Sequence, residues 1–498
     1  MADRDGAVLG LDIGTSSSKA VLVGPDGQVL RSAARDHAVQ RPAPGHVELS
    51  ADVWWEEAVA LIGELTAPGD VRIEAIGVSG MGPCVLLAAV DGTPVRPTIL
   101  YGVDTRAEAQ IRRITAELGE EEILRRAGCV LSSQAAGPKI AWVAEHEPEA
   151  YARASRLFMP SSHLTFRLTG EYVMDRVSAS LVAPLYDPTT ADWHRPWAER
   201  IAPGIELPTL RWAGERAGAV LPAVAARLPG IEAGTPVITG TLDAWSEALS
   251  VGATAPGDVM LMYGTTTFLV ALTTEPRPSR TLWPTAGLAA GTHTLCGGMA
   301  SSGAITGWLR ELTGGADVPT LLAEAQESGP GARGLLMLPY FAGERSPMHD
   351  PSARGVLAGL TLSHTRGDLY RAALEAAAFG VRHHVEELAA AGVPVREMTV
   401  AGGGARDPLW PQIVSDVTGV PQRIPRDTVG ASYGSARLAA AGVLGLDTSG
   451  WNPTVARLDP DPALGPLYEE LYGQFRDLYP ATLPVAHALA RLQEDAGR

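Results

Sequence analysis

The first 30 residues place short apolar runs on either side of polar turns, a pattern typical of antiparallel strands. The runs "VLGLDI" (8–13) and "AVLV" (20–23) flank the polar stretch "GTSSSK" (14–19). A second turn, Pro25-Asp26-Gly27, has the residue types that favour tight turns. No helical pattern follows the lysine, and the spacing is not that of a P-loop. The pattern therefore predicts a β-hairpin whose connecting turn is rich in hydroxyl groups.

Beyond the hairpin, helical patterns alternate with strand patterns. Residues 50–65 ("SADVWWEEAVALIGEL") repeat apolar positions at helical spacing after a serine or aspartate that can cap a helix. Residues 73–95 read as strands, with Asp91-Gly92 as a hairpin turn. Residues 106–127 and 139–152 are again helical in pattern. This alternation predicts an α/β architecture.

The two halves of the chain contain a similar motif. "GAVLGLDIGTSSSKAVL" (6–22) and "GDVMLMYGTTTFLVAL" (257–272) each place Gly-Thr and further hydroxyls between two apolar runs. Their turn glycines lie 250 residues apart, half the chain length. The repeat predicts two similarly built domains that each present a phosphate-binding hairpin. The alternative is that this common turn occurs twice by coincidence.

A third glycine-rich turn follows the apolar strand pattern before residue 402. Gly402-Gly403-Gly404 separates that strand from a helical pattern that starts at Asp407 or Pro408. Glycines at a strand-to-helix turn let a ligand approach the backbone closely, and a helix N-terminus favours anions. A tight turn without a ligand is the alternative interpretation.

Length and charge restrict the class of protein. A chain of 498 residues is long enough for two or three domains. The formal net charge of −16 argues against a general nucleic-acid or anionic-membrane binder, because phosphate backbones require basic surface. The acidic N-terminus does not resemble a secretory signal, and no apolar run reaches about 18 residues. We therefore expect a cytoplasmic protein without nucleic-acid or membrane partners.

The cysteines add no metal or disulfide site to this picture. Cys84, Cys129 and Cys296 are scattered, without metal-ligand spacing. An odd cysteine count in so long a chain makes a disulfide framework improbable and favours a reducing compartment.

The three loops, in this order and spacing, resemble the FGGY family of carbohydrate kinases, which has the actin-like ATPase fold. The most specific match joins residues 355–360 ("GVLAGL") to residues 368–375 ("DLYRAALE"). Residues 139–146 ("KIAWVAEH") match the N-terminal signature in part. "FAGERSPMHDPSARG" (341–355) and "ASYGSARLAAAGVLG" (431–445) are also similar to family segments. The resemblance extends from Leu9 to about residue 445.

The resemblance implies two actin-like ATPase (ribonuclease H-like) α/β domains with a catalytic cleft between them. Residues 1–240 would form the N-terminal domain, which binds the sugar and carries the first phosphate loop. Residues 241–498 would form the C-terminal domain, which binds the nucleotide, and its last helix would pack back on the first domain. The implied reaction is ATP-dependent phosphorylation of a sugar hydroxyl with Mg²⁺, and a homodimer is common among relatives.

Two aspartates receive the central roles from this resemblance. Asp12 ends the first strand, where a carboxylate can hold magnesium through water. Asp243 matches the family's Gly-x-x-Asp motif, so it is the expected general base and a second metal-binding carboxylate. The alternative for Asp243 is the N-cap of the helix that follows it.

The same resemblance assigns the nucleotide to the three glycine loops. In related kinases an asparagine usually stands where this chain has Asp407. The expected phosphate- and ATP-binding residues are Gly14, Thr15, Ser16, Ser17, Lys19, Gly264, Thr265, Thr266, Gly402, Gly403, Gly404 and Asp407.

The sugar-binding segments depart from the family patterns. Residues 81–84 read Met-Gly-Pro-Cys, where pentulose kinases have Gln-Met-His-Gly and glycerol kinases have an Arg-Glu pair. Residues 101–106 (Tyr-Gly-Val-Asp-Thr-Arg) replace Trp-Asn-Asp-x-Arg and are one residue longer before the aspartate. The expected substrate residues are Met81, Gly82, Tyr101, Asp104, Gln134, Asp243, Trp245 and Glu247. Of these, Trp245 can instead be a core residue, and Asp104 and Glu247 can instead pair with arginines.

Taken as a whole, the sequence most resembles those of xylulose kinases. A ketopentose such as D-xylulose is therefore the expected substrate. Another ketose or a sugar alcohol (a tetrulose, ribulose, erythritol or a glycerol-like polyol) is the alternative. A third interpretation is a weakly catalytic protein that responds to nucleotide or sugar. The presence of both Asp12 and Asp243 disfavours it.

Overall fold

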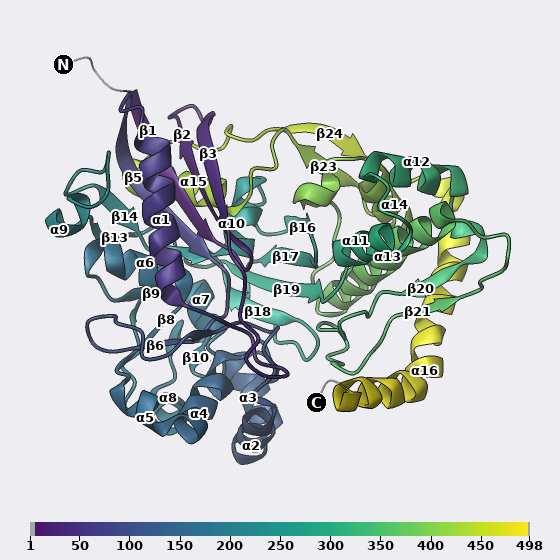
Figure 1. Ribbon diagram of the computed structural model, residues 1–498, viewed down its shortest axis with the longest axis horizontal. Helices are drawn as coiled ribbons and strands as arrows, with labels where there is room; N and C mark the ends of the chain where they lie inside the picture. Colours follow the sequence, from purple (N-terminus) through teal and green to yellow (C-terminus); the bar gives the residue numbers. More distant parts are fainter. Residues whose placement is uncertain (1–4, 497–498) are drawn as a thin grey trace. The chain divides into compact units, whose positions relative to one another are not determined.

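The chain folds into two compact units, each built from strands and helices (Figure 1). The computed structural model describes residues 5–496. Unit 1 consists of the chain up to Pro256 with Leu272–Thr294 and Val429–Pro453; unit 2 consists of Gly257–Ala271, Leu295–Thr428 and the chain from Thr454 onward. The α/β prediction is confirmed. The two units alternate along the sequence, since Leu272–Thr294 and Val429–Pro453 join the first 256 residues in unit 1. The domains 1–240 and 241–498, with their ligands, stay predictions.

A mixed sheet forms the centre of unit 1. Its strands lie in the order β13-β14-β5-β1-β2-β3, and β15 also pairs with β5. They are β1 (Asp5–Ile13), β2 (Ser17–Val23), β3 (Val29–Asp36), β5 (Val71–Gly80), β13 (Arg216–Ala219), β14 (Pro236–Ile238) and β15 (Thr241–Leu242). The predicted hairpin is confirmed by antiparallel β1 and β2, while β1 runs parallel to β5. This register places Asp12 between Lys19 on β2 and Ser79 on β5.

Side chains alternate between the two faces of β1, and different helices cover the two faces. Leu9 packs into a core with α1 (Ala51–Thr66). Val8 packs instead into a second core with α15 (Ala431–Leu444). Because strand side chains repeat every second residue, Asp12 lies on the same face as Val8. The helix α15 therefore covers the face of the sheet that carries Asp12.

Glycines let α15 approach this face closely, which predicts a large effect of adding a methyl group. A Cβ on Gly77 would lie 1.9 Å from the carbonyl oxygen of Ser435 on α15. Backbone cannot move aside as a flexible side chain can, so Gly77→Ala should lower the free energy of unfolding by about 1–3 kcal/mol or more. Urea unfolding measures the change. The matched control is Gly63→Ala inside α1, where the methyl group meets nothing within 4 Å and should stabilise by up to about 1 kcal/mol.

The helices of unit 1 follow the predicted ones with two interruptions. The predicted helix 50–65 is confirmed as α1, capped by Ser50. The predicted helices 106–127 and 139–152 are each divided into two, at Gly119 and at Glu147. The elements of unit 1 not given above are β4 (Glu48–Leu49), β6 (Leu86–Ala88), β7 (Thr98–Ile99), α2 (Glu108–Leu118), α3 (Glu120–Ala127), α4 (Ala136–His146), α5 (Pro148–Arg153), β8 (Arg156–Phe158), α6 (Pro160–Thr169), β9 (Val173–Asp175), α7 (Arg176–Ser180), β10 (Tyr186–Asp187), β11 (Asp192–Trp193), α8 (Arg195–Ile201), β12 (Thr209–Arg211), α9 (Pro222–Ala225), α10 (Asp243–Ser250) and β18 (Trp283–Ala286).

Unit 2 contains its own mixed sheet with a hairpin of the same design. Strands β16 and β17 are antiparallel, as β1 and β2 are in unit 1, and β16 is parallel to β22, as β1 is to β5. The elements are β16 (Val259–Tyr263), β17 (Thr267–Thr273), β19 (His293–Met299), α11 (Gly303–Leu312), α12 (Val318–Ser328), β20 (Leu336–Leu338), β21 (Val356–Ala358), α13 (Arg366–Ala390), β22 (Met398–Ala401), α14 (Leu409–Thr418), β23 (Gln422–Pro425), β24 (Thr454–Leu458) and α16 (Gly465–Ala496), with short 3-10 turns at Ala332–Gly334, Gly403–Ala405 and Pro462–Leu464. The repeat seen in the sequence is therefore a structural repeat. The last helix, α16, belongs to unit 2, and its predicted packing on the first domain stays a prediction.

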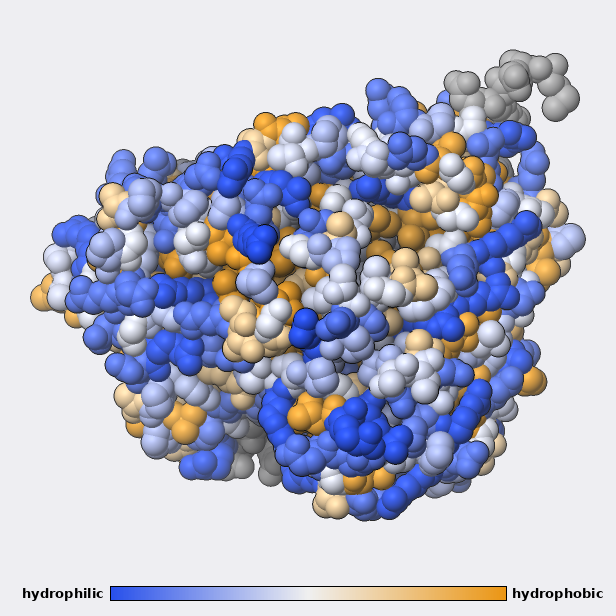
Figure 2. Space-filling view, turned by 180° about the vertical axis from the view of Figure 1, so that it is seen from behind, coloured by the Kyte–Doolittle hydropathy of each residue, from blue (hydrophilic) through white to orange (hydrophobic). Residues whose placement is uncertain are grey.

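Hydrophilic residues predominate on the face shown in Figure 2, and apolar residues gather in several groups among them. Within residues 5–496, no helix has the length and apolar character needed to cross a membrane.

Candidate active site

The turn between β1 and β2 leaves backbone donors available for a ligand. Gly14 donates its N–H to the carbonyl oxygen of Ser17 at 3.0 Å, which closes the turn. Among residues 5–496, the N–H groups of Thr15 and Ser16 donate no hydrogen bond. Successive free amides at a turn form a concave anion-binding surface. The first loop therefore has the donors that a phosphate group needs.

Side chains behind this loop fix its shape. The His37 Nε2 atom lies 3.1 Å from the carbonyl oxygen of Gly14, and Nδ1 lies 2.9 Å from Glu57 Oε2. Ser18 donates its hydroxyl to the same glutamate oxygen at 2.5 Å. The backbone N–H of His37 also donates to the carbonyl oxygen of Ser16 at 2.9 Å. The loop is thus held by α1, through Glu57, and by the end of β3.

Asp12 lies at the end of β1, beside this loop. Its carboxylate accepts a hydrogen bond from the Ser79 hydroxyl at 2.8 Å. Burial raises the pKa of Asp12, while the Ser79 hydrogen bond and the charge of Lys19 act to lower it. The arrangement places a buried carboxylate next to free amide donors.

Asp243 is the first residue of α10. Its side chain accepts a hydrogen bond from the N–H of Ala244 at 2.8 Å. Burial, followed by repulsion from Asp12, raises the pKa of Asp243 to about 7. The N-cap of α10 is Leu242, so the N-cap alternative for Asp243 is not what the structure has. A buried carboxylate whose pKa is raised by burial and by a neighbouring carboxylate is typical of a functional site.

Glu247 follows one turn later on α10. Burial, then the charge of Asp12, raises its pKa to about 7, whereas Lys19 acts to lower it. Asp12, Lys19, Asp243 and Glu247 thus form one electrostatic cluster, and we call these four residues the acidic cluster.

The expected sugar residues divide into two groups. Tyr101 lies beside the first loop, with its hydroxyl 3.0 Å from Thr15 Oγ1. Asp104 is fully buried, and its carboxylate accepts hydrogen bonds from Arg106 and from the N–H of Val47 at 2.6 Å. The arginine pairing named as the alternative for Asp104 is therefore present, and its sugar contact stays a prediction.

Four more of the expected sugar residues lie in or beside the protein interior. Trp245 is 4% exposed and donates its indole N–H to the Thr294 hydroxyl at 2.9 Å. Gln134 accepts a hydrogen bond from the N–H of Gly102 at 2.8 Å. Met81 is 1% exposed. Met81 and Gly82 are the two residues that follow the end of β5. Contacts of these residues with a sugar stay predictions.

The second loop, in unit 2, repeats the design of the first. Gly264 donates its N–H to the carbonyl oxygen of Thr266 at 3.1 Å, and Gly303 of α11 donates to the carbonyl oxygen of Gly264 at 3.1 Å. Within the described chain, the N–H groups of Thr265 and Thr266 have no hydrogen-bond acceptor. This loop has the same two free amides as the first loop, and its role toward phosphate stays a prediction.

The glycine triplet follows β22 in the same unit. Gly402 has φ +86°, and a Cβ on it would lie 2.5 Å from the carbonyl oxygen of Tyr263. A Cβ on Gly403, in contrast, would meet nothing within 4 Å. Asp407 accepts a hydrogen bond from the N–H of Leu409 at 2.9 Å at the start of α14. The fold thus requires glycine at position 402, whereas a side chain at position 403 would have open space around it.

Two residues of the site were not singled out for a role from the sequence. Ser79 is found only from the register of β1 against β5. Lys139 carries the partial N-terminal signature, but its contacts with the backbone of residues 100 and 101 follow from the tertiary structure.

The chemistry of Mg²⁺ fits the acidic cluster in one specific way. Among the described residues, no three or more His, Cys, Asp or Glu side chains are grouped as metal ligands. Mg²⁺ commonly keeps several waters and binds through one or two carboxylates together with substrate phosphates. Asp12 and Asp243 supply such oxygen donors beside the free amides of the first loop. The residues present fit a metal that arrives with a nucleotide rather than a permanently chelated ion.

Comparisons with known proteins agree with this geometry. The family models of the FGGY carbohydrate kinases match residues 7–250 (N-terminal domain) and 259–443 (C-terminal domain). The chain is 30% identical to the xylulose kinase of Escherichia coli K12 over 440 residues, covering 86% of this chain and 89% of that protein. It is 32% identical to the glycerol kinase of Gloeobacter violaceus over 457 residues, covering 90% and 89%. The crystal structure of xylulose kinase from Rhodospirillum rubrum superposes with a TM-score of 0.87 at 33% identity, covering 97% of this chain and all of that one.

Proposed function

Because the chain belongs to the FGGY family of carbohydrate kinases and is therefore an ATP-dependent kinase of a sugar or polyol, we propose that its acceptor is a ketopentose such as D-xylulose. The predicted two-domain actin-like ATPase fold is confirmed with the family. The observation that supports the chemistry is the pair of buried carboxylates, Asp12 and Asp243, beside the free amides of the first loop.

Asp243 acts as the general base in this proposal. Its raised pKa shows that its buried environment favours the protonated form, so a carboxylate here readily accepts a proton. The sugar hydroxyl loses its proton to Asp243 as its oxygen bonds to the γ-phosphorus of ATP, while the bond from that phosphorus to the bridging oxygen breaks and ADP leaves. Residues of the substrate segments, Tyr101 among them, orient the sugar for this step.

The loops and Asp12 handle the phosphates. Free amides at Thr15 and Ser16 supply hydrogen bonds to the transferring phosphoryl group, and Lys19 adds positive charge. Asp12 and Asp243 would hold Mg²⁺ through water, and the ion would supply positive charge that neutralises the phosphates. In unit 2, Thr265, Thr266 and the glycine triplet would bind the rest of the nucleotide.

The sugar specificity is tested with a panel of acceptors in a coupled assay for ADP. We expect the highest kcat/KM with D-xylulose among ketopentoses, tetruloses, hexuloses and polyols. Glycerol or erythritol as the best acceptor would overturn the ketopentose proposal while leaving the kinase assignment intact. Glycerol kinases among the relatives make this polyol outcome the second candidate. ATP hydrolysis that no acceptor stimulates would instead support a weakly catalytic binding protein that responds to nucleotide.

The nucleotide role of the glycine triplet is tested with a matched pair of substitutions. Gly403→Ala adds a methyl group into open space, so the fold should persist while KM for ATP rises about tenfold, which corresponds to about 1.4 kcal/mol. Gly402→Ala instead strains a positive φ and meets Tyr263, so it should lower the melting temperature. Steady-state kinetics and thermal unfolding of both variants measure this contrast. An unchanged KM in Gly403→Ala would remove residue 403 from the site.

A further inference from the structure

Lys139 is a buried ammonium group that forms no ion pair with a carboxylate among residues 5–496. It lies in the first turns of α4 and is 1% exposed. Its Nζ atom donates to two main-chain carbonyls, Leu100 O at 2.7 Å and Tyr101 O at 2.6 Å. Burial lowers the pKa of Lys139 to about 8, while the charge of Asp104 acts to raise it. Removing an ammonium group from water costs free energy, and an apolar side chain at this position would avoid that cost. The two hydrogen bonds are therefore the feature that distinguishes Lys139 from an apolar residue.

The chain segment around Lys139 fixes both sides of Tyr101. Lys139 binds the carbonyls of residues 100 and 101. Just before α4, Gln134 accepts the N–H of Gly102 at 2.8 Å, and the Ser133 hydroxyl donates to the carbonyl oxygen of Gly102 at 3.0 Å. Four hydrogen bonds from residues 133–139 therefore clamp the peptide groups of residues 100–102.

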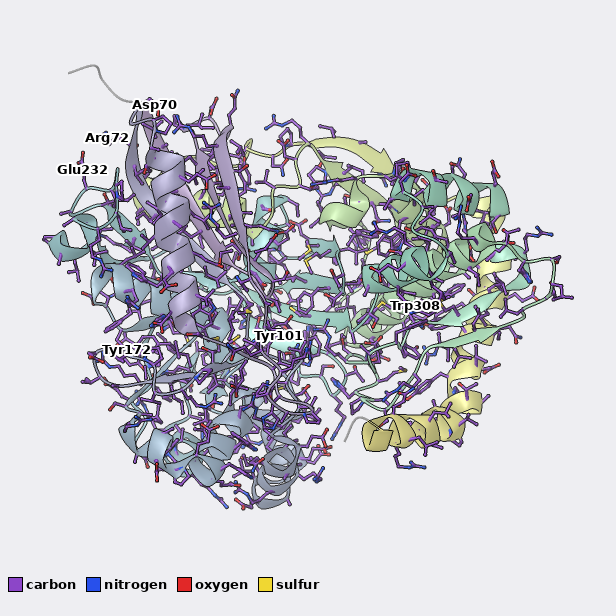
Figure 3. The ribbon with its side chains drawn as sticks, viewed as in Figure 1. Asp70, Arg72, Tyr101, Tyr172, Glu232 and Trp308 are labelled. Atoms are coloured by element: carbon purple, nitrogen blue, oxygen red, sulfur yellow. The ribbon has the colours of Figure 1, made fainter. Side chains whose placement is uncertain are left out.

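The side chain of Tyr101 connects this clamp to the first phosphate loop. Its hydroxyl lies 3.0 Å from the hydroxyl of Thr15, whose own backbone N–H is one of the free donors of the loop. Tyr101, which is labelled in Figure 3, is half-buried. It belongs to unit 1, as Thr15 and Lys139 do. Since the backbone of Tyr101 is fixed, the position of its hydroxyl is restricted to a few rotamers.

We propose that Lys139 is a positioning residue for phosphoryl transfer: by holding the backbone of Tyr101, it sets the Tyr101 hydroxyl against Thr15 and so fixes the first phosphate loop. The chain of contacts runs from α4 through residues 100–102 to the β1–β2 turn. Misplacing a loop that orients the transferring group by about 1 Å can cost up to about 100-fold in rate. The proposal rests on the kinase function proposed above, but the contacts exist in the free protein.

The test is a double-mutant cycle with Lys139→Met and Tyr101→Phe. Each single variant should lose about 10- to 100-fold in kcat, with a smaller change in KM for the sugar. Because both act through one contact, the double variant should be no slower than the slower single variant. Hydrogen exchange of residues 11–20, measured without any substrate, should become faster in all three variants. If Lys139→Met does not fold, Lys139→Gln, which keeps an N–H donor, takes its place.

The control is another buried cation away from this contact. Arg371 is 4% exposed and pairs with Glu375 at 2.7 Å in unit 2. Arg371→Met should lower the melting temperature without changing the exchange of residues 11–20. Multiplicative kcat losses, or unchanged exchange in Tyr101→Phe, would overturn the proposal. A sugar KM raised more than tenfold with kcat and exchange unchanged would instead make Lys139 a sugar contact. A wild-type protein without kinase activity would refute the proposed function, while the exchange data would still decide on the clamp.

Discussion

Asp243→Asn should reduce kcat by about 10²–10⁴-fold, the contribution expected of a general base. Asparagine keeps the size and the hydrogen bond to the N–H of Ala244 but cannot accept the sugar proton. The fold should not suffer. Burial and Asp12 raise the pKa of Asp243 to about 7, so its ionised form opposes folding as the pH rises through this range. The neutral amide removes that cost, and the unliganded variant should melt at or above the wild-type temperature at pH 8.

A coupled kinase assay and thermal unfolding measure these two quantities on the same samples. Asp175→Asn is the matched control, because Asp175 is also buried in unit 1 and burial raises its pKa to about 6. Its carboxylate binds the Thr241 hydroxyl and caps α7, outside the acidic cluster. The control should keep most of its kcat. Near-normal turnover in Asp243→Asn would show that another group accepts the proton.

Asp12→Asn should raise the Mg²⁺ concentration needed for half-maximal activity and lower kcat by about 10²-fold or more, since a bound metal supplies several kcal/mol of transition-state stabilisation. The loss of one carboxylate leaves Asp243 as the only metal-binding aspartate of the pair. Titration of activity with Mg²⁺ at saturating ATP gives both parameters. Chelation of the metal from the wild-type protein should abolish turnover and be fully reversed by added Mg²⁺.

Ser79→Ala is the control for Asp12. It removes only the hydroxyl that donates to the Asp12 carboxylate at 2.8 Å. Outer hydrogen-bond partners of metal-binding groups typically contribute 10- to 100-fold in metal affinity, so the shift in Mg²⁺ dependence should be smaller than in Asp12→Asn but in the same direction. An unchanged Mg²⁺ dependence in Asp12→Asn would exclude Asp12 from the metal site.

The hairpins and the first helix could be predicted because their signals are local. Short apolar runs define β1 and β2, and the hydroxyl-rich turn between them is recognisable by composition. The repeat at residues 257–272 correctly predicted a second hairpin in unit 2. The order and spacing of these loops also resemble those of the FGGY family, and the family models match the chain.

The division into units was less predictable, because it depends on contacts between distant segments. Residues 429–453 follow the second hairpin by more than 150 positions, yet their helix α15 packs on β1 in unit 1. Only the close approach of α15 to the glycines of β1 and β5 explains this placement. A sequence pattern shows that a helix has a small-residue face, but not which sheet that face contacts.

What the sequence determined by itself was the reaction class, through the resemblance of its loops and signature segments to the FGGY carbohydrate kinases. What only the tertiary structure decided was how the individual side chains are used. Asp104 pairs with Arg106, and Trp245 is in the interior, whereas Lys139 binds the backbone of Tyr101. The physical reason is that a side chain's partners depend on register and packing between segments far apart in the chain. Local periodicity carries no information about those partners.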